Sequence, residues 1–114
     1  MSPAEPPVDR RAAPRGRTLL RGRICHGPHY VISVPCGIKN LTAEGALLQI
    51  ADLQPLPPAF ALINITAGLA YEAQLTWRQD NLAGVALRSC LDLHQPVEGE
   101  LKALRRIWMA LAPA

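Results

Sequence analysis

One segment, Leu69 to Arg78, alternates between apolar and polar side chains, and this pattern constrains the fold more than any other feature of the chain. Its apolar members are Leu69, Tyr71, Ala73, Leu75 and Trp77, and residues 72, 74, 76 and 78 are polar. Successive side chains of a β-strand point to opposite faces, so we expect the apolar set to face a core and Arg78 to face water. The polar "RQDN" and the apolar "LAGVALR" that follow predict a β-hairpin.

Four further short segments have the composition of strands and are separated by turn residues. They are residues 18–25, residues 30–38, "ALLQI" at 46–50 and "AFALINI" at 59–65. Pro35 and Gly37 place the second of them at a sheet edge or a bulge, and "KNLTAEG" between the second and third predicts a polar turn. Six short strands without intervening helices predict an all-β fold, a small six-stranded antiparallel barrel over residues 18–95.

The C-terminal residues 96–112 change from a strand pattern to a helix pattern. Val97, Leu101, Leu104, Trp108 and Leu111 are spaced 4, 3, 4 and 3 residues apart, which places them on one stripe of an amphipathic helix. Two interpretations remain open for this stripe. It packs onto the barrel, for instance at an open end, or it forms an interface with a second copy or a partner.

Residues 1–17 form an N-terminal arm that differs from the rest of the chain. The arm contains four prolines and almost no large apolar side chain, so we expect it to be flexible. Residues 1–23 hold six arginines and two acidic residues, whereas the remainder holds six basic and seven acidic residues. The formal net charge of +3 therefore originates in the N-terminal region.

The sequence offers little for catalysis, metal binding or membrane insertion. No serine has histidine and acid partners in a recognisable order, so we expect no enzymatic activity. Cys25, His26, His29 and Cys36 are zinc-type ligands, but their spacing matches no compact zinc motif and packed cysteines explain them better.

The opening residues lack the apolar segment of a secretory signal, no apolar run is long enough to cross a bilayer, and three cysteines suit a reducing compartment. We therefore expect a cytoplasmic protein without a cofactor.

The arginines of the arm have three interpretations. A solvated tail is the simplest. Nonspecific nucleic-acid binding is disfavoured, because the chain has only five aromatic residues and its strands show no basic stripe. The third is a phosphorylated ligand held between the arm and the barrel, for which the planar arginine fork is suited, since it pairs with phosphate and with the O6 and N7 edge of guanine.

Two motifs favour the third interpretation through a resemblance to a known family. "RAAPR", Arg11 to Arg15, has the Arg-x-x-x-Arg spacing of the PilZ domain family, and "NLTAEG", Asn40 to Gly45, resembles its second motif. "LTWRQDNLAGVAL" resembles its later strands, so the resemblance extends from Arg10 to Arg88. It implies a six-stranded barrel that binds the bacterial second messenger cyclic di-GMP, with the arginine motif in an N-terminal linker over the ligand.

Carried over by position, the resemblance implies these site residues. Arg11 and Arg15 contact phosphate and guanine, Asn40 and Thr42 hydrogen-bond the base or hold the loop, and Gly45 permits close backbone approach. From the residues alone, two further candidates are Arg10, which precedes this pair and adds positive field, and Arg78, which from the polar face of its strand either reaches a phosphate or is solvated. From the residues alone, Gly45 equally fits a turn that requires a positive φ, and Asn40 equally fits a side-chain cap of that turn.

Thr42 departs from the family pattern, which has serine at this position. The methyl group stiffens the rotamer and crowds a bound base while the hydroxyl is kept. Two functions follow as expectations. One is a single-domain cyclic di-GMP receptor that changes shape and signals through a protein partner, by way of the C-terminal helix or the arm. The alternative is a PilZ-like adaptor with weak or no nucleotide binding.

Overall fold

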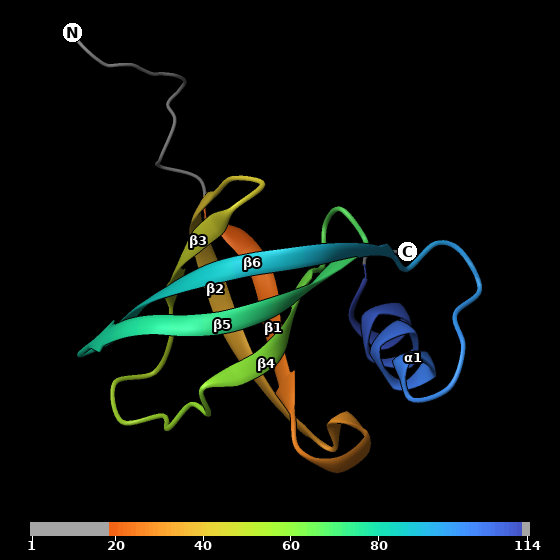
Figure 1. The fold of residues 1–114 in the computed structure, drawn as a ribbon, viewed down its shortest axis with the longest axis horizontal. Helices are drawn as coiled ribbons and strands as arrows, with labels where there is room; N and C mark the ends of the chain where they lie inside the picture. Colours follow the sequence, from red (N-terminus) through yellow and green to blue (C-terminus); the bar gives the residue numbers. More distant parts are fainter. Residues whose placement is uncertain (1–18, 113–114) are drawn as a thin grey trace, which may run out of the picture.

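The computed structural model describes residues 19–112, which form six β-strands, a short 3-10 helix and one α-helix (Figure 1). The strands are β1 (Leu20–His26), β2 (Ile32–Leu41), β3 (Gly45–Gln49), β4 (Ala59–Asn64), β5 (Leu69–Gln79) and β6 (Leu82–Asp92). The 3-10 helix η2 (Pro28–Tyr30) joins β1 to β2, and α1 (Leu101–Leu111) follows β6. The strands pair antiparallel and close in the order β1-β2-β3-β6-β5-β4, which confirms the predicted barrel with a C-terminal helix.

The interior of the barrel is filled by side chains from every strand, so it is a packed core. Ile24, Leu48 and Leu62 are fully buried there. Full burial of such a side chain stabilises the fold by roughly 1.5–3 kcal/mol. Of the predicted core residues of β5, Ala73 is a buried member of this cluster, and Tyr71 and Leu75 are half-buried against it.

A second apolar cluster lies outside the barrel wall, where α1 covers β1, β4 and β5. Its buried members include Cys25, Ile63 and Ala70 from the strands and Leu104 from the helix. Figure 1 shows α1 beside the wall rather than across an end of the barrel. The helical stripe therefore packs onto the barrel, and it does so on the outer face of the sheet.

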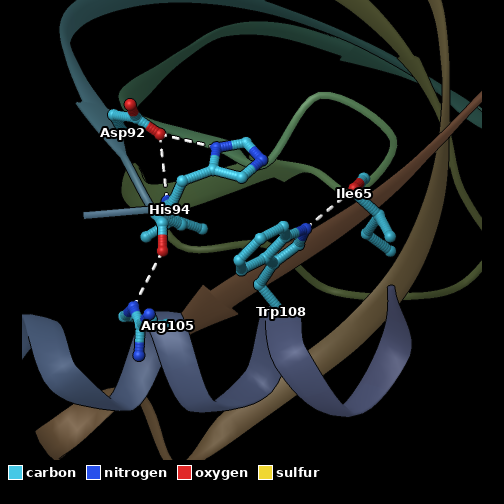
Figure 2. A network of polar contacts seen from close by, with 6 residues as sticks. Ile65, Asp92, His94, Arg105 and Trp108 are labelled. Carbon is cyan, nitrogen blue, oxygen red and sulfur yellow. Dashed lines mark hydrogen bonds and ion pairs between the residues drawn. The ribbon is translucent and has the colours of Figure 1, made fainter. Parts of the chain in front are cut away.

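Polar contacts fix the orientation of α1 on this wall (Figure 2). The indole Nε1 of Trp108 donates a hydrogen bond of 2.8 Å to the carbonyl of Ile65, and Nε of Arg105 donates one of 2.9 Å to the carbonyl of Leu93. The ring of His94 meets Trp108 edge-on at 4.8 Å between centroids. The backbone N–H of His94 donates a hydrogen bond to Asp92 and holds the pKa of that carboxyl below its usual range.

The sequence pattern places the start of the helix at Pro96, but the helix begins five residues later, at Leu101. Gly99 has a φ of 59°, in the left-handed region that a right-handed helix cannot include. Val97 is nevertheless only 9% exposed, because the loop before the helix carries it back onto the molecule. The apolar periodicity thus correctly identified Val97 and Leu104 as buried and placed Trp108 and Leu111 against the barrel, but Leu101, in the first turn of the helix, is 38% exposed.

β5 departs from simple alternation, because a register shift with β6 lies between Leu75 and Trp77. Leu75 pairs with Val85, whose side chain is in the core, and Trp77 pairs with Gly84, one residue along. Thr76 is the extra residue of this β-bulge, so the faces exchange beyond it. The expectation that Trp77 faces the core is therefore wrong: Trp77 faces outward and is 45% exposed.

The same bulge changes the position of Arg78. Arg78 pairs with the core residue Ala83 and lies on the inner face at the strand's end, whereas the alternation predicts that it faces water.

Candidate functional site

Four residues form a row across the outer face of the barrel, one on each of four neighbouring strands. Asn40 of β2 pairs with Leu47 of β3, Leu47 pairs with Gly84 of β6, and Gly84 pairs with Trp77 of β5. Their neighbours along the strands, including Leu48 and Val85, point into the core, so the row itself points outward. We call Asn40, Leu47, Gly84 and Trp77 the outer row. It joins the first residue of the "NLTAEG" motif to an exposed aromatic side chain.

The indole of Trp77 lies directly over the backbone of Gly84. A Cβ atom added at Gly84 would overlap the indole, coming within 2.6 Å of its Cδ1. Gly84 therefore leaves room for the indole over the neighbouring strand, where almost half of Trp77 stays exposed. An exposed flat indole can stack on a planar base, and such stacking is worth about 1–3 kcal/mol per base.

Asn40 lies within β2 rather than in the polar turn that the sequence predicts. β2 continues to Leu41, and its register against β3 shifts between Ile38 and Asn40, which makes Lys39 the extra residue of a bulge. Asn40 is exposed on the outer face. Its amide is therefore positioned by a strand, not by a cap of the following turn.

The turn after β2 is organised by the hydroxyl of Thr42. Its Oγ1 accepts hydrogen bonds from the backbone N–H groups of Glu44 (3.2 Å) and Gly45 (3.1 Å), and donates one to the Gly45 carbonyl (3.3 Å). The backbone N–H of Thr42 donates to the same carbonyl at 2.9 Å. Of the two roles expected for Thr42, holding the loop is the one that these contacts perform. A hydroxyl on threonine serves this role as well as one on serine.

Gly45 is required by strand packing, because a Cβ at this position would lie 2.9 Å from the carbonyl oxygen of Val85 in β6. The residues with positive φ in the described part of the chain do not include Gly45, so that explanation of this glycine is wrong. The close approach that it permits here is between two strands of the barrel.

Arg78 binds the loop between β3 and β4. Its Nη1 donates to the carbonyl of Gln54 at 2.6 Å, its Nη2 donates to the carbonyls of Ala51 (3.1 Å) and Asp52 (3.0 Å), and its Nε donates to Asp80 (3.0 Å). All three nitrogens of the guanidinium are thus engaged with backbone oxygens. Arg78 holds the loop over one end of the barrel instead of presenting its charge on the polar face, where the alternation placed it.

Two arginines of β1, which belong to neither sequence motif, lie on the outer face beside β2. Arg23 donates from Nε to the Ser33 hydroxyl at 2.6 Å, and Arg21 donates from Nη1 to the Leu111 carbonyl at 3.3 Å. Their spacing of two residues, on either side of the buried Gly22, is the signal that places both outside. They add positive charge next to the strand that carries Asn40.

The described chain begins on this same face, at Leu19. The side chain of Leu19 covers Gly37 of β2, where an added Cβ would come within 2.6 Å of it. Gly37 precedes Asn40 by three residues. The predicted site residues Arg10, Arg11 and Arg15 lie outside the described residues, in the segment that leads to Leu19.

The candidate zinc ligands do not come together. Cys25 faces α1 and Cys36 faces the barrel interior, on opposite sides of the sheet. Burial raises the pKa of Cys25 to about 11 and that of Cys36 to about 12, so both thiols are protonated at neutral pH. Among residues 19–112, no three histidine, cysteine or acidic side chains form a group that could hold a metal ion.

A hollow of about 470 Å³ lies away from the outer row, between η2, β4, β5 and the residue before α1. Its lining includes His26, Tyr30, Glu72, Arg88 and Glu100, none of them predicted as site residues. Burial, together with the nearby charges of Glu100 and Glu72, raises the pKa of the Tyr30 phenol. Nε2 of His26 is buried there without a hydrogen-bond partner among the described residues.

Comparison of the chain with protein-family models, with curated proteins and with solved structures gave no match. None of the helices described between residues 19 and 112 has the length and apolar character needed to cross a membrane. The candidate site therefore stands on the geometry of the outer row, which includes Asn40 of the "NLTAEG" motif.

Proposed function

We propose that the protein is a receptor for cyclic di-GMP, which binds on the outer face of β2, β3, β6 and β5. The observation that carries this proposal is the outer row, which aligns Asn40 of the "NLTAEG" motif with the exposed indole of Trp77. A cyclic dinucleotide offers planar bases to stack on an indole and phosphates to pair with arginines. No catalytic step is part of this function.

Each residue has a defined part in the proposed complex. One guanine stacks on Trp77, whose indole already lies over Gly84. Asn40 bonds the edge of a base, and the Thr42 turn holds Asn40 and β3 in register. Arg11 and Arg15 reach the phosphates and the O6 and N7 edge of guanine, and Arg21 and Arg23 add a favourable field beside β2.

Signalling in this proposal comes from the arm, which precedes Leu19, a residue whose side chain lies on Gly37 of β2. A ligand held by both Arg15 and the barrel fixes the arm on that face, and the cost of ordering the arm is subtracted from the gross binding energy. The resulting surface is what a protein partner recognises.

A second candidate, an adaptor with weak or no nucleotide binding, is favoured by one group of contacts. The Thr42 hydroxyl already makes three hydrogen bonds within its turn, and Arg78 is engaged with four carbonyls. Two of the candidate ligand-binding residues are thus committed to the fold.

Calorimetric titration with cyclic di-GMP, GTP and a short DNA duplex at two salt concentrations separates these functions. Saturable binding of the cyclic dinucleotide alone supports the receptor. The absence of binding to all three supports the adaptor, and DNA binding that weakens steeply with salt indicates a nucleic-acid-binding protein. A Trp108→Phe variant leaves Trp77 as the single tryptophan, so quenching of its fluorescence by cyclic di-GMP reports stacking at the outer row.

A further inference from the structure

A second surface of the molecule has a different character from the outer row. A groove of about 320 Å³ runs between the exposed side of α1 and the loop that precedes it. Its lining residues are Pro96, Val97, Lys102, Arg105, Arg106 and Met109. Three of the six carry positive charge and none is acidic, so the groove combines an apolar floor with basic side chains.

The helix presents these basic side chains because its other face is occupied. Leu104 is 2% exposed against the barrel, and Ile107, Trp108 and Leu111 pack around it. α1 contains one lysine, two arginines and no acidic residue. Lys102, Arg106 and Met109 therefore point away from the barrel and are exposed.

One cation of the groove is held in place before any partner arrives. Arg105 donates from Nε to the carbonyl of Leu93 at 2.9 Å and from Nη1 to the sulfur of Met109 at 3.4 Å. Met109 is 58% exposed, and its unbranched thioether adapts to an incoming side chain. The fold thus already immobilises part of this surface, so that less conformational entropy is lost when a partner binds.

We propose that this groove docks an acidic peptide segment of a protein partner. The carboxylates of the segment pair with Lys102, Arg105 and Arg106, and an aliphatic side chain enters between Val97 and Met109. Charge complementarity carries the choice of occupant. The inference rests on the adaptor part of the proposed function, for which it supplies the chemistry of the partner.

Two other anionic partners fit this surface less well. A helix that lies in a membrane surface inserts its apolar face, and the apolar face of α1 is buried against the barrel. A nucleic acid needs an extended row of cations along its backbone, whereas this groove offers three cations around a concave apolar floor. An acidic amphipathic peptide matches both the charge and the shape.

The test measures fluorescence anisotropy of a fluorescein-labelled twelve-residue peptide that repeats Leu-Glu-Glu-Asp. We expect saturable binding that weakens several-fold as salt rises, and no binding of the same peptide with lysine in place of its acidic residues. Lys102→Glu and Arg106→Glu should each weaken binding about tenfold, because each replaces an attraction by a repulsion. Arg88→Glu, an equal charge change at an exposed position of β6 outside the groove, should change affinity less than about twofold.

Three results would overturn the inference. They are no binding of the acidic peptide, equal weakening by Arg88→Glu and Arg106→Glu, and binding of phosphatidylserine vesicles or DNA with the same dependence on Lys102 and Arg106. Circular dichroism and thermal unfolding verify that each variant is folded. Titration of the same samples with cyclic di-GMP separates the proposals: nucleotide binding without peptide binding removes only the docking groove, and peptide binding without nucleotide binding removes only the receptor.

Discussion

Trp77 and Gly84 form a directly opposed pair across β5 and β6, with the indole lying on the glycine backbone. A Cβ atom at position 84 would overlap the indole in its observed position, so only glycine permits this arrangement. The pair depends on the bulge at Thr76, whose hydroxyl donates a hydrogen bond of 2.9 Å to the carbonyl of Gly84. One residue type, glycine, and one backbone irregularity thus create the flat aromatic surface that the proposed ligand uses.

Gly84→Ala should displace the Trp77 indole from the outer row. We expect a loss of about 1–2 kcal/mol in the free energy of unfolding, typical of overpacking, measured by urea denaturation. Cyclic di-GMP binding should weaken as the stacking surface is lost. The double variant Trp77→Ala, Gly84→Ala is the control: its stability loss should be smaller than the sum of the single losses, because the clash is absent. Additive losses would contradict the contact.

Arg78 should matter for stability and not for nucleotide affinity. Arg78→Ala removes hydrogen bonds to Gln54, Ala51 and Asp52, and we expect unfolding to be easier by about 2–3 kcal/mol. Faster amide hydrogen exchange in the loop between β3 and β4 should accompany the loss. Arg78→Lys should recover only part of the stability, since an ammonium lacks the planar fork. A large drop in cyclic di-GMP affinity without a loss of stability would instead assign Arg78 to the ligand.

The hydroxyl of Thr42, rather than its methyl group, should hold the turn before β3. Thr42→Ser keeps the three hydrogen bonds, and we expect a change in stability below about 0.5 kcal/mol. Thr42→Val keeps the shape but loses the hydroxyl, which should cost about 1 kcal/mol. Chemical denaturation of the pair compares them directly. Equal stability of the serine and valine variants would show that the turn does not depend on these bonds.

The three cysteines should differ sharply in reactivity. Cys90 is exposed, whereas Cys25 is buried, Cys36 is half-buried, and their pKa values are raised to about 11 and about 12. A thiol-reactive dye at pH 8 should label one cysteine rapidly and the other two only after unfolding. Cys90→Ser should abolish the rapid phase. Rapid labelling that persists in this variant would contradict the burial of the other two.

The raised pKa values of Cys25 and Cys36 predict a loss of stability in alkali. The unfolded chain ionises its thiols near pH 9, while the folded protein keeps Cys25 and Cys36 neutral to higher pH. The stability that the folded state gains from keeping these thiols neutral is therefore complete below pH 9 and is lost as the pH rises toward 11 and 12. Urea unfolding between pH 8 and 11 should show a shallower decline for Cys36→Ala than for the unaltered chain, and Cys90→Ser serves as the control. An equal decline in stability for Cys36→Ala and for the unaltered chain would contradict the raised pKa of Cys36.

Arg11→Ala and Arg15→Ala test the arm, which lies outside the described residues. A charge-assisted hydrogen bond is worth about 1.5–3 kcal/mol, so each change should weaken cyclic di-GMP binding by about tenfold to a hundredfold. Calorimetry measures the effect, and Arg88→Ala, an arginine of β6 away from the outer row, is the matched control. Unchanged affinity in both arm variants would remove the cyclic di-GMP assignment.

Much of the fold follows from patterns within single segments of the sequence. The strand-like segments, the turns between them and the apolar stripe of residues 97–111 each have a local signature, and they predicted the barrel and its helix. These signals are local because side-chain period and turn geometry depend on neighbouring residues. The two motifs with "RAAPR" and "NLTAEG" are likewise local, so the sequence determined which residues are candidates.

Only the tertiary structure decided which way several of these residues face. The bulge at Thr76 depends on the pairing of β5 with β6, and it exchanged the predicted positions of Trp77 and Arg78. The outer row takes one residue from each of four strands, so no single segment reveals it. A shift of one residue in register turns a side chain to the other face of a sheet, and register is set by the partner strand. The sequence by itself therefore determined the elements and the motifs, and the closure of the barrel determined which side chains share its outer face.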